Sequence, residues 1–175
     1  ASSTAELVFN NTPISKENIL GGEIDGFKKV MNILNASRIG IAAQGVGLAQ
    51  AAYDVSLLYA KQRSVFGAKL SEFQAIQWMI ADMATEIEAS RMLVYKAADH
   101  KDKNIRYVKE ASMAKLLSSK VAVESANKAV QIHGGLGYFS PTIAERLYRD
   151  SKVTEIYEGT SEVQRMIISR ECLNN

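Results

Sequence analysis

Cysteine and proline are scarce in this sequence of 175 residues. The one cysteine, Cys172, leaves no partner for an internal disulfide and no cysteine-based metal site, and it suits a reducing compartment. The two prolines, Pro13 and Pro141, both lie outside the long periodic segments. Because proline breaks a helix from within, the chain between them can be almost wholly helical.

Long hydrophobic runs and an excess of one charge are also missing. No apolar run approaches the ~20 residues that span a bilayer, and the first residues lack the basic start and apolar stretch of a signal peptide. With 21 basic and 19 acidic residues the net charge is only +2, so nothing indicates nucleic-acid binding. We therefore expect no membrane span, no nucleic-acid partner, and a location in the cytoplasm or, in a eukaryote, the mitochondrial matrix.

Metal-binding patterns are missing as well. His100 and His133 have no ligand partners at a useful spacing, so we expect no metal site. Trp78 and the six methionines fit a core or an interface better than a cofactor contact.

What the sequence does contain is the periodicity of long helices. Apolar residues recur every three or four positions from about residue 25 to residue 62, and the glycines and alanines among them indicate close helix packing. Capping patterns and glycines predict the later helices. These run from Ser71-x-x-Gln74 to about His100, from about Val108 to Gly134–Gly135, from Ser140–Pro141 onward, and from Ser161-x-x-Gln164 to about Cys172.

The predicted fold class is all-α, an antiparallel helical bundle in one domain, because long helices with short connections pack in this way. Residues 5–10, just before Pro13, have the pattern of a short extended segment. A single strand has no partner within this sequence. We therefore expect its partners to lie upstream.

Three short segments carry the candidate chemistry, and each also has an ordinary structural explanation. Glu158 lies in a loop between two helices, where an acidic residue near a helix start is common. The segment 131–138 is glycine-rich, which exposes backbone N–H groups to a ligand or simply ends a helix. Arg63 lies in a turn, where it suits a phosphate or carboxylate, or is merely solvated. None of the three decides the function alone.

Together, in this order and at these separations, the three segments resemble the acyl-CoA dehydrogenase family. The resemblance covers nearly the whole chain and is greatest for the short-chain, butyryl-CoA-like branch. It extends to Asn35–Gly40, Arg63-x-x-Phe66-Gly67, Lys109–Lys115 and Tyr148–Asp150.

The family builds each subunit from an N-terminal helical domain, a middle β domain and a C-terminal helical domain, and this chain resembles the third. The resemblance implies that residues 1–22 are the end of the middle β domain and its exit loop. Residues 23–175 would then form the C-terminal helical bundle domain.

The activity implied by the resemblance is the FAD-dependent α,β-dehydrogenation of a short-chain acyl-CoA to a trans-2-enoyl-CoA. Glu158 matches the base that removes the α-proton. Some branches place the base just before the arginine matched by Arg38, but Ser37 stands there, so the assignment falls on Glu158. The residues that the resemblance assigns to the substrate are Asn35, Arg38, Tyr157 and Gly159.

The resemblance also implies that FAD binds across two copies of the chain. Thr160, Ser161 and Glu162 match residues that contact the FAD of the same subunit. A second set matches residues that contact the adenosine diphosphate of the neighbouring subunit's FAD: Arg63, Phe66, Gln74, Gln131, Gly134 and Gly135. We therefore expect a homo-oligomer, either a dimer or a dimer of dimers (a homotetramer), with electron-transferring flavoprotein as the electron acceptor.

Two alternatives remain at this point. The chain could be a non-catalytic helical oligomerisation module, although an intact Glu158 and intact FAD-matching residues argue against it. It could instead belong to a relative such as an acyl-CoA oxidase or a nitroalkane-oxidising enzyme, although the stretch 157–160 favours the dehydrogenase. With part of the site outside this chain, we expect the isolated chain to be inactive.

Overall fold

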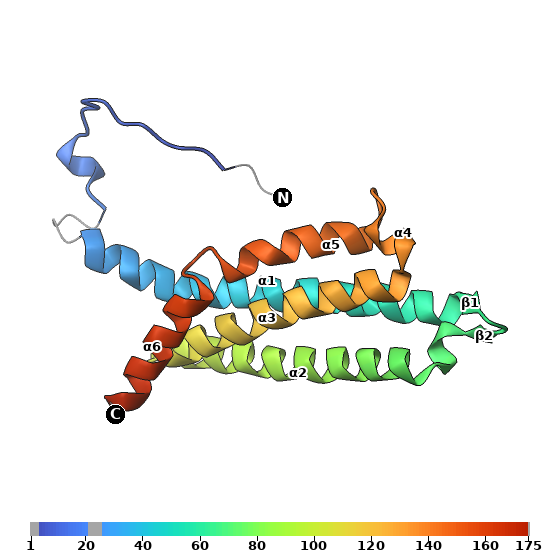
Figure 1. Cartoon of the computed structure of the whole chain (residues 1–175). Helices are drawn as coiled ribbons and strands as arrows, with labels where there is room; N and C mark the ends of the chain where they lie inside the picture. The colour runs from blue at the N-terminus through green and yellow to red at the C-terminus, as the bar shows by residue number, and fades with distance from the viewer. Residues whose placement is uncertain (1–3, 21–25, 175) are drawn as a thin grey trace.

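The computed structural model describes residues 4–20 and 26–174. Three long helices run side by side along the molecule (Figure 1): α1 (Gly26–Gln62), α2 (Gln74–Asp102) and α3 (Val108–His133). α5 (Ile143–Lys152) packs on α3 and α1, and α6 (Ser161–Leu173) crosses α3 near one end. The short turns are η1 (Lys16–Asn18), η2 (Leu70–Glu72), α4 (Gly135–Tyr138) and η3 (Val153–Glu155). The predicted all-α antiparallel bundle is confirmed.

The centre of the bundle is built from small side chains. A Cβ atom added at Gly45 of α1 would lie 2.9 Å from the carbonyl oxygen of Ser118 on α3, so the two helices approach as closely as their backbones allow. The predicted close packing is confirmed there, whereas Gly40 and Gly47 border open space. The fully buried alanines of these helices are Ala42, Ala49, Ala52, Ala111, Ala114, Ala122, Ala126 and Ala129.

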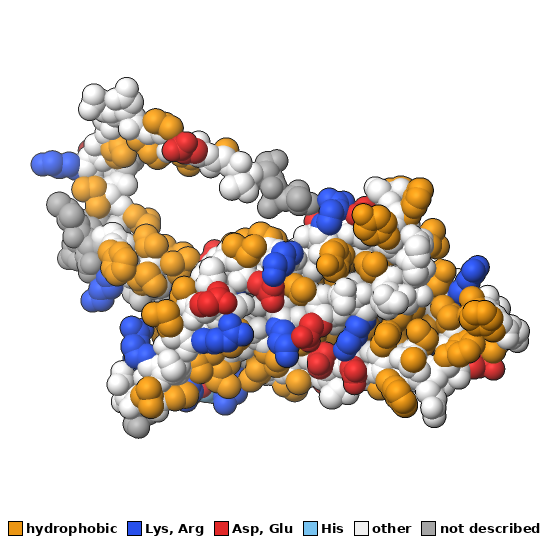
Figure 2. All heavy atoms as spheres, viewed as in Figure 1, with side chains coloured by type: hydrophobic (Ala, Val, Ile, Leu, Met, Phe, Trp, Pro, Cys, Tyr) orange, Lys and Arg blue, Asp and Glu red, His pale blue; other side chains and the backbone are white. Residues whose placement is uncertain are grey.

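Many large apolar side chains lie outside this core. Phe27 and Leu58, whose spacing helped to predict α1, are 81% and 58% exposed, and Trp78 of α2 is 64% exposed. Figure 2 shows hydrophobic side chains exposed toward both ends of the bundle, with acidic and basic side chains interspersed between them. The hydrophobic spacing thus predicted the helix but not the face that packs inward.

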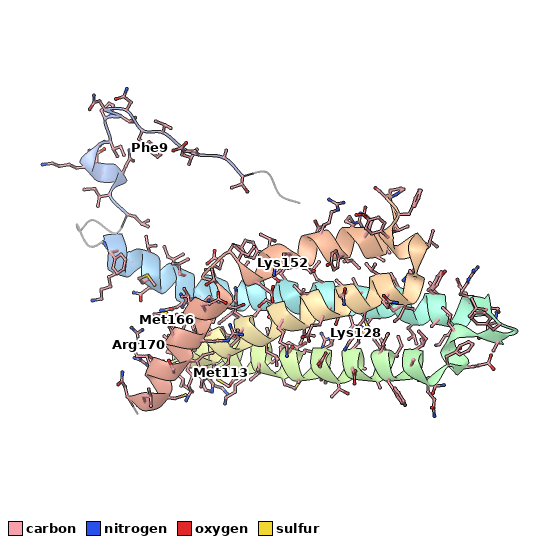
Figure 3. The ribbon with its side chains drawn as sticks, in the orientation of Figure 1. Phe9, Met113, Lys128, Lys152, Met166 and Arg170 are labelled. Atoms are coloured by element: carbon pink, nitrogen blue, oxygen red, sulfur yellow. The ribbon has the colours of Figure 1, made fainter. Side chains whose placement is uncertain are left out.

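The N-terminal segment leads away from the bundle. Residues 4–15 form neither helix nor strand, and Phe9 lies on this arm at a distance from the helices (Figure 3). The extended trace of residues 5–10 has no partner strand in the described part of the chain. Asp25 and the expected domain boundary between residues 22 and 23 lie outside the described residues.

The predicted start of α2 is wrong in its capping. Ser71 was expected to cap the helix, but it lies within η2, and α2 begins at Gln74. Instead, the Glu72 carboxylate accepts a hydrogen bond from the backbone N–H of Lys69 (2.7 Å). A 3-10 turn therefore precedes the helix, and Phe73 stands at the N-cap of α2 without a side-chain hydrogen bond.

The predicted starts of the last two long helices are also displaced. α5 begins at Ile143, after Thr142 in an extended conformation, rather than at Pro141. α6 is capped by Thr160, whose hydroxyl oxygen accepts from the N–H of Val163 (3.4 Å), so Ser161 is the first helical residue rather than the cap. Thr160 rather than Ser161 is the cap, because the sharp loop before it gives Thr160 the extended backbone that a cap residue needs.

A two-stranded hairpin joins α1 to α2, where the sequence predicts only a turn. β1 (Ser64–Val65) pairs antiparallel with β2 (Ala68–Lys69). Phe66 and Gly67 between them have φ angles of 52° and 83°, and positive φ at both central residues is the signature of a type I′ turn. The hairpin extends the bundle beyond the end of α1 (Figure 1).

Candidate active site

A sharp loop between η3 and α6 carries Glu158. Glu158 and Gly159 both have positive φ, at 56° and 92°. For a residue with a side chain this conformation costs roughly 1–3 kcal/mol, and it persists only where the surroundings enforce it. The loop turns the Glu158 side chain toward α1, where its Oε2 accepts a hydrogen bond from the Ser37 hydroxyl (2.6 Å).

Three buried side chains from three helices hold the backbone of this loop. Lys115 of α3 donates its Nζ to the carbonyl oxygen of Gly159 (2.8 Å), and Gln164 of α6 donates to the same oxygen (2.9 Å). Gln164 also donates to the carbonyl oxygen of Glu158 (3.3 Å), as does Arg38 Nε of α1 (3.5 Å). Arg38, Lys115 and Gln164 are at most 2% exposed. These four hydrogen bonds therefore hold the strained backbone at Glu158 in place.

Two of these three supports are cations. Burial lowers the pKa of Arg38, and the attraction of Glu158 opposes that effect. Burial likewise lowers the pKa of Lys115, with Glu155 opposing the shift, Arg38 adding to it, and Glu158 and Glu162 opposing it. The loop that carries Glu158 thus lies against two buried cationic side chains.

The other two expected substrate residues border different cavities. Asn35 accepts from Arg38 Nη1 (2.6 Å) and lines a cavity of about 610 Å³ together with Lys101 and Arg106. Tyr157 donates its hydroxyl to Gln44 and lines a second cavity of about 500 Å³. Burial raises the pKa of Tyr157. Arg38 lies beneath the loop and lines neither cavity.

The expected FAD residues at the start of α6 lie next to the base loop. The Glu162 carboxylate accepts from its own backbone N–H and from the Thr160 hydroxyl, which together hold its pKa below the ordinary value. Ser161 is the first residue of this 13-residue helix. Since the start of a helix carries unpaired N–H groups and a partial positive charge, this end favours an acceptor or an anion.

The remaining expected FAD residues lie at the opposite end of the bundle. Along α1, Arg63 is about 37 Å from Arg38 at the usual helical rise. It lines a cavity of about 390 Å³ with Gly134 and Gly135, and a Cβ atom at either glycine would meet nothing within 4 Å. Phe66, Gln74 and Gln131 are exposed and are not among the residues that line this cavity. The structure thus brings together three of these six residues.

Four partners of the site were missed from the sequence: Ser37, Gln44, Lys115 and Gln164. Ser37 had been considered only as the absence of a base, and Gln164 was wrongly expected to complete a capping box. Lys115 carried a usable signal, because it lies one helical turn from Ala111 and Ser118 on the buried face of α3. A lysine on such a face of small residues must find an acceptor.

The site and the bundle define a helical domain that holds a carboxylate on a rigid loop. The family model of the acyl-CoA dehydrogenase C-terminal domain matches residues 24–173. The chain therefore belongs to the acyl-CoA dehydrogenase family, of which it is the C-terminal domain.

Several of its relatives are short-chain acyl-CoA dehydrogenases. The mitochondrial short-chain specific acyl-CoA dehydrogenase of Bos taurus is 49% identical over 175 residues, which are 100% of this chain and 42% of that protein. The structure of butyryl-CoA dehydrogenase from Megasphaera elsdenii matches with a TM-score of 0.92 at 45% identity, over 95% of this chain and 43% of that one. Subunit CarC of the caffeyl-CoA reductase-Etf complex of Acetobacterium woodii is 48% identical over 95% of this chain and 44% of that protein. The chain spans less than half the length of these relatives.

No helix in residues 4–20 and 26–174 is long and apolar enough to cross a membrane. The same residues contain no group of three or more histidine, cysteine or acidic side chains arranged to hold a metal ion.

Proposed function

We propose that this domain supplies the catalytic base and part of the FAD site of an enzyme that converts a short-chain acyl-CoA to the trans-2-enoyl-CoA. The observation that carries the proposal is the geometry of Glu158. Its carboxylate is held by Ser37 at 2.6 Å on a loop whose backbone is fixed by buried donors. A general base has to be placed in this way before its proton-accepting strength matters.

In the proposed reaction, Glu158 accepts the α-proton of the bound thioester. The hydrogen bond from Ser37 orients the carboxylate while it is ionised. The backbone N–H of Glu158 donates to the thioester carbonyl oxygen and thereby increases the acidity of the α-carbon. FAD, when bound, supplies the acceptor for the β-hydrogen. Tyr157 and Gly159 border the thioester, and Asn35 lies nearer the CoA moiety. Arg38, buried beneath the loop, contributes to the cleft by donating to Asn35 and to the carbonyl oxygen of Glu158.

The described residues fit FAD in two places. Arg63 beside the open backbones of Gly134 and Gly135 suits a diphosphate, because a guanidinium and glycine N–H groups both donate to phosphate oxygens. Thr160, Ser161 and Glu162 offer donors and acceptors at the start of α6. Arg63 lies about 37 Å along α1 from Arg38, and Arg38 contacts the loop just before Thr160. We therefore assign the two places to two different FAD molecules.

This assignment makes a homo-oligomer, a dimer or a dimer of dimers, part of the proposal. The side chains of Phe66, Gln74 and Gln131 are exposed. In this proposal they complete the diphosphate-binding site only when a second copy of the chain packs against them. We propose electron-transferring flavoprotein as the electron acceptor, in keeping with the Etf complex to which the CarC relative belongs. A mitochondrial relative and bacterial relatives support a matrix or cytoplasmic location.

We also propose that residues 1–22 end a β domain and that residues 23–175 form the helical domain. The partnerless segment 5–10 supports this division. Residues 1–175 alone should therefore neither retain FAD tightly nor oxidise butyryl-CoA, because half a site lacks pre-organisation. Bleaching of added FAD by butyryl-CoA with this chain alone would contradict it.

The central test is Glu158→Gln in the full-length protein. We expect kcat to fall by ~10²–10⁴-fold, the usual contribution of general-base catalysis, while acyl-CoA binding stays nearly intact because the shape is kept. Stopped-flow flavin reduction and calorimetric titration measure the two quantities. Glu124→Gln, the same change in a surface ion pair with Lys120 of α3, is the matched control.

Normal turnover in Glu158→Gln would place the base elsewhere. The oxidase alternative is separated by a second measurement, the rate at which oxygen reoxidises the reduced flavin. Slow reoxidation supports the dehydrogenase.

A further inference from the structure

Lys115 is the most unusual charged residue of the bundle. It lies in the middle of α3 among alanines and serines, and none of its surface is exposed. Burying an ammonium is costly, and an apolar side chain of similar length would fill the same space. The ammonium instead donates to a single backbone oxygen, that of Gly159, the residue after the proposed base (2.8 Å).

Gln164 of α6 also donates to the backbone of this loop. Its amide nitrogen donates to the oxygens of Gly159 and Glu158, while its own Oε1 is buried without a hydrogen-bond partner. An unsatisfied buried oxygen is unfavourable, so this side chain is present for its donor. Two costly buried groups thus converge on one carbonyl oxygen, beside a backbone with positive φ at residues 158 and 159.

Lys115 also brings charge, which Gln164 does not. Four charged groups act on its ammonium: Arg38 repels it, and the carboxylates of Glu155, Glu158 and Glu162 attract it. Glu158 in turn lies near Arg38, Lys115 and the phenol of Tyr157. Lys115 therefore differs from Gln164 in carrying a charge near the Glu158 carboxylate.

We propose that Lys115 is a positioning residue for dehydrogenation: its hydrogen bond to the carbonyl oxygen of Gly159 fixes the loop that carries Glu158. This inference rests on the proposed function of Glu158 as the base. Lys115 does not touch substrate or flavin. Gln164 shares this role through its own hydrogen bond to the same oxygen.

The test compares variants in the full-length holoenzyme. Lys115→Met keeps the length of the side chain and removes both donor and charge. We expect kcat to fall on the order of 10²-fold, the effect of misplacing a reacting group by about 1 Å, with KM little changed. Lys115→Arg, which keeps a cationic donor at this position, should recover part of the lost kcat.

Two further variants test the loop contacts. Gln164→Leu removes the second donor to the carbonyl oxygen of Gly159, so kcat should fall with KM little changed. Lys128→Met is the matched control, because Lys128 lies on the same helix but faces α2, where it pairs with Asp82 and Glu86 (Figure 3). It should leave kcat and KM unchanged.

Amide hydrogen exchange of the peptide spanning residues 157–164 gives a readout that does not depend on turnover. Exchange should accelerate in Lys115→Met and in Gln164→Leu but not in Lys128→Met. If Lys115→Met does not fold, Lys115→Gln, which also removes the charge, takes its place in every comparison.

Unchanged kcat together with unchanged exchange in Lys115→Met would overturn the inference. Normal turnover in Glu158→Gln would instead remove the proposed function, and the exchange measurement would still decide whether Lys115 holds the loop.

Discussion

The two ends of this bundle are built in opposite ways. At the Glu158 end, the backbone oxygens of residues 158 and 159 accept hydrogen bonds from buried side chains of α1, α3 and α6. At the hairpin end, Phe66 is 99% exposed, and Gln74 and Gln131 are exposed as well. The Glu158 end is held by side chains of the same chain. The hairpin end leaves Phe66, Gln74 and Gln131 without contacts that would bury them within this chain.

This difference separates what one chain can specify alone from what needs a neighbour. A base must be placed within a fraction of an ångström, which requires rigid support from the same fold. The proposed diphosphate contacts, from an exposed arginine and from glycine backbones, would tolerate assembly from two copies. We therefore expect substitutions at the Glu158 end to affect the chemical step, and substitutions at the hairpin end to affect cofactor binding and assembly.

Gly159→Ala should give the largest effect. Gly159 has φ of 92°, and an added Cβ atom would lie 2.7 Å from Nε2 of the buried Gln164. The methyl group must displace that side chain and the loop with it, so we expect a loss of kcat on the order of 10²-fold or more in the full-length enzyme. Single-turnover flavin reduction measures it.

Gly47→Ala is the control for this change. Gly47 lies within α1, and an added Cβ atom meets nothing within 4 Å. Alanine should stabilise the helix by roughly 0.5–1 kcal/mol and leave kcat unchanged. Equal kinetics in the two variants would mean that the Glu158 end is less rigid than its contacts indicate.

Arg63→Ala should have an intermediate effect, confined to the hairpin end. Hydrogen bonds to charged groups contribute about 1.5–3 kcal/mol, so the dissociation constant of FAD should rise by roughly 10–150-fold. Reconstitution of the apoprotein followed by flavin fluorescence measures it. Since Arg63 is exposed, the melting temperature of the apoprotein should not change. Unaltered FAD affinity would exclude this cavity as a phosphate site.

Arg106→Ala should have the smallest effect. Arg106 pairs with Glu171 of α6 through two hydrogen bonds of 2.8 and 2.7 Å, and holds the pKa of that carboxyl below its ordinary value. A depressed pKa stabilises the fold above the unfolded-state pKa of about 4.3, and that contribution is lost as pH falls through the folded-state value.

The melting temperatures of wild type and Arg106→Ala should therefore differ at neutral pH and converge in acid. Combining Arg106→Ala with Glu171→Gln isolates the pair. A gap that stays constant down to pH 3 would show that the arginine acts through packing rather than charge. Because Arg106 lines the cavity beside Asn35 and makes no contact with the Glu158 loop, any kinetic change should appear in KM and not in kcat.

Helix existence was predictable here, whereas helix ends were not. The spacing of apolar residues predicted α1, α2 and α3 to within a few residues, because periodicity over many turns outweighs local exceptions. The starts of α5 and α6 were displaced because more than one residue near each could serve as the cap. Which of them does so depends on the loop before it, and hence on tertiary contacts.

The site was predictable only as far as a motif could be matched. Glu158 could be singled out, but the partners that hold it could not, because Ser37, Lys115 and Gln164 come from helices whose relative rotation is a property of the packed bundle. The hairpin was missed because a type I′ turn usually announces itself with Asn-Gly or Gly-Gly rather than Phe-Gly.

The seam of small residues between α1 and α3 has a consequence for how this sequence can change over evolutionary time. At Gly45, even a methyl group would meet the backbone of the opposing helix. At the buried alanines, a larger residue overfills a closely packed contact, and glycine weakens the helix by about 1 kcal/mol. Neither direction of change is neutral, so accepted substitutions among descendants of this sequence should accumulate on the outward faces of these helices. The seam should stay almost fixed even where the large outward residues drift.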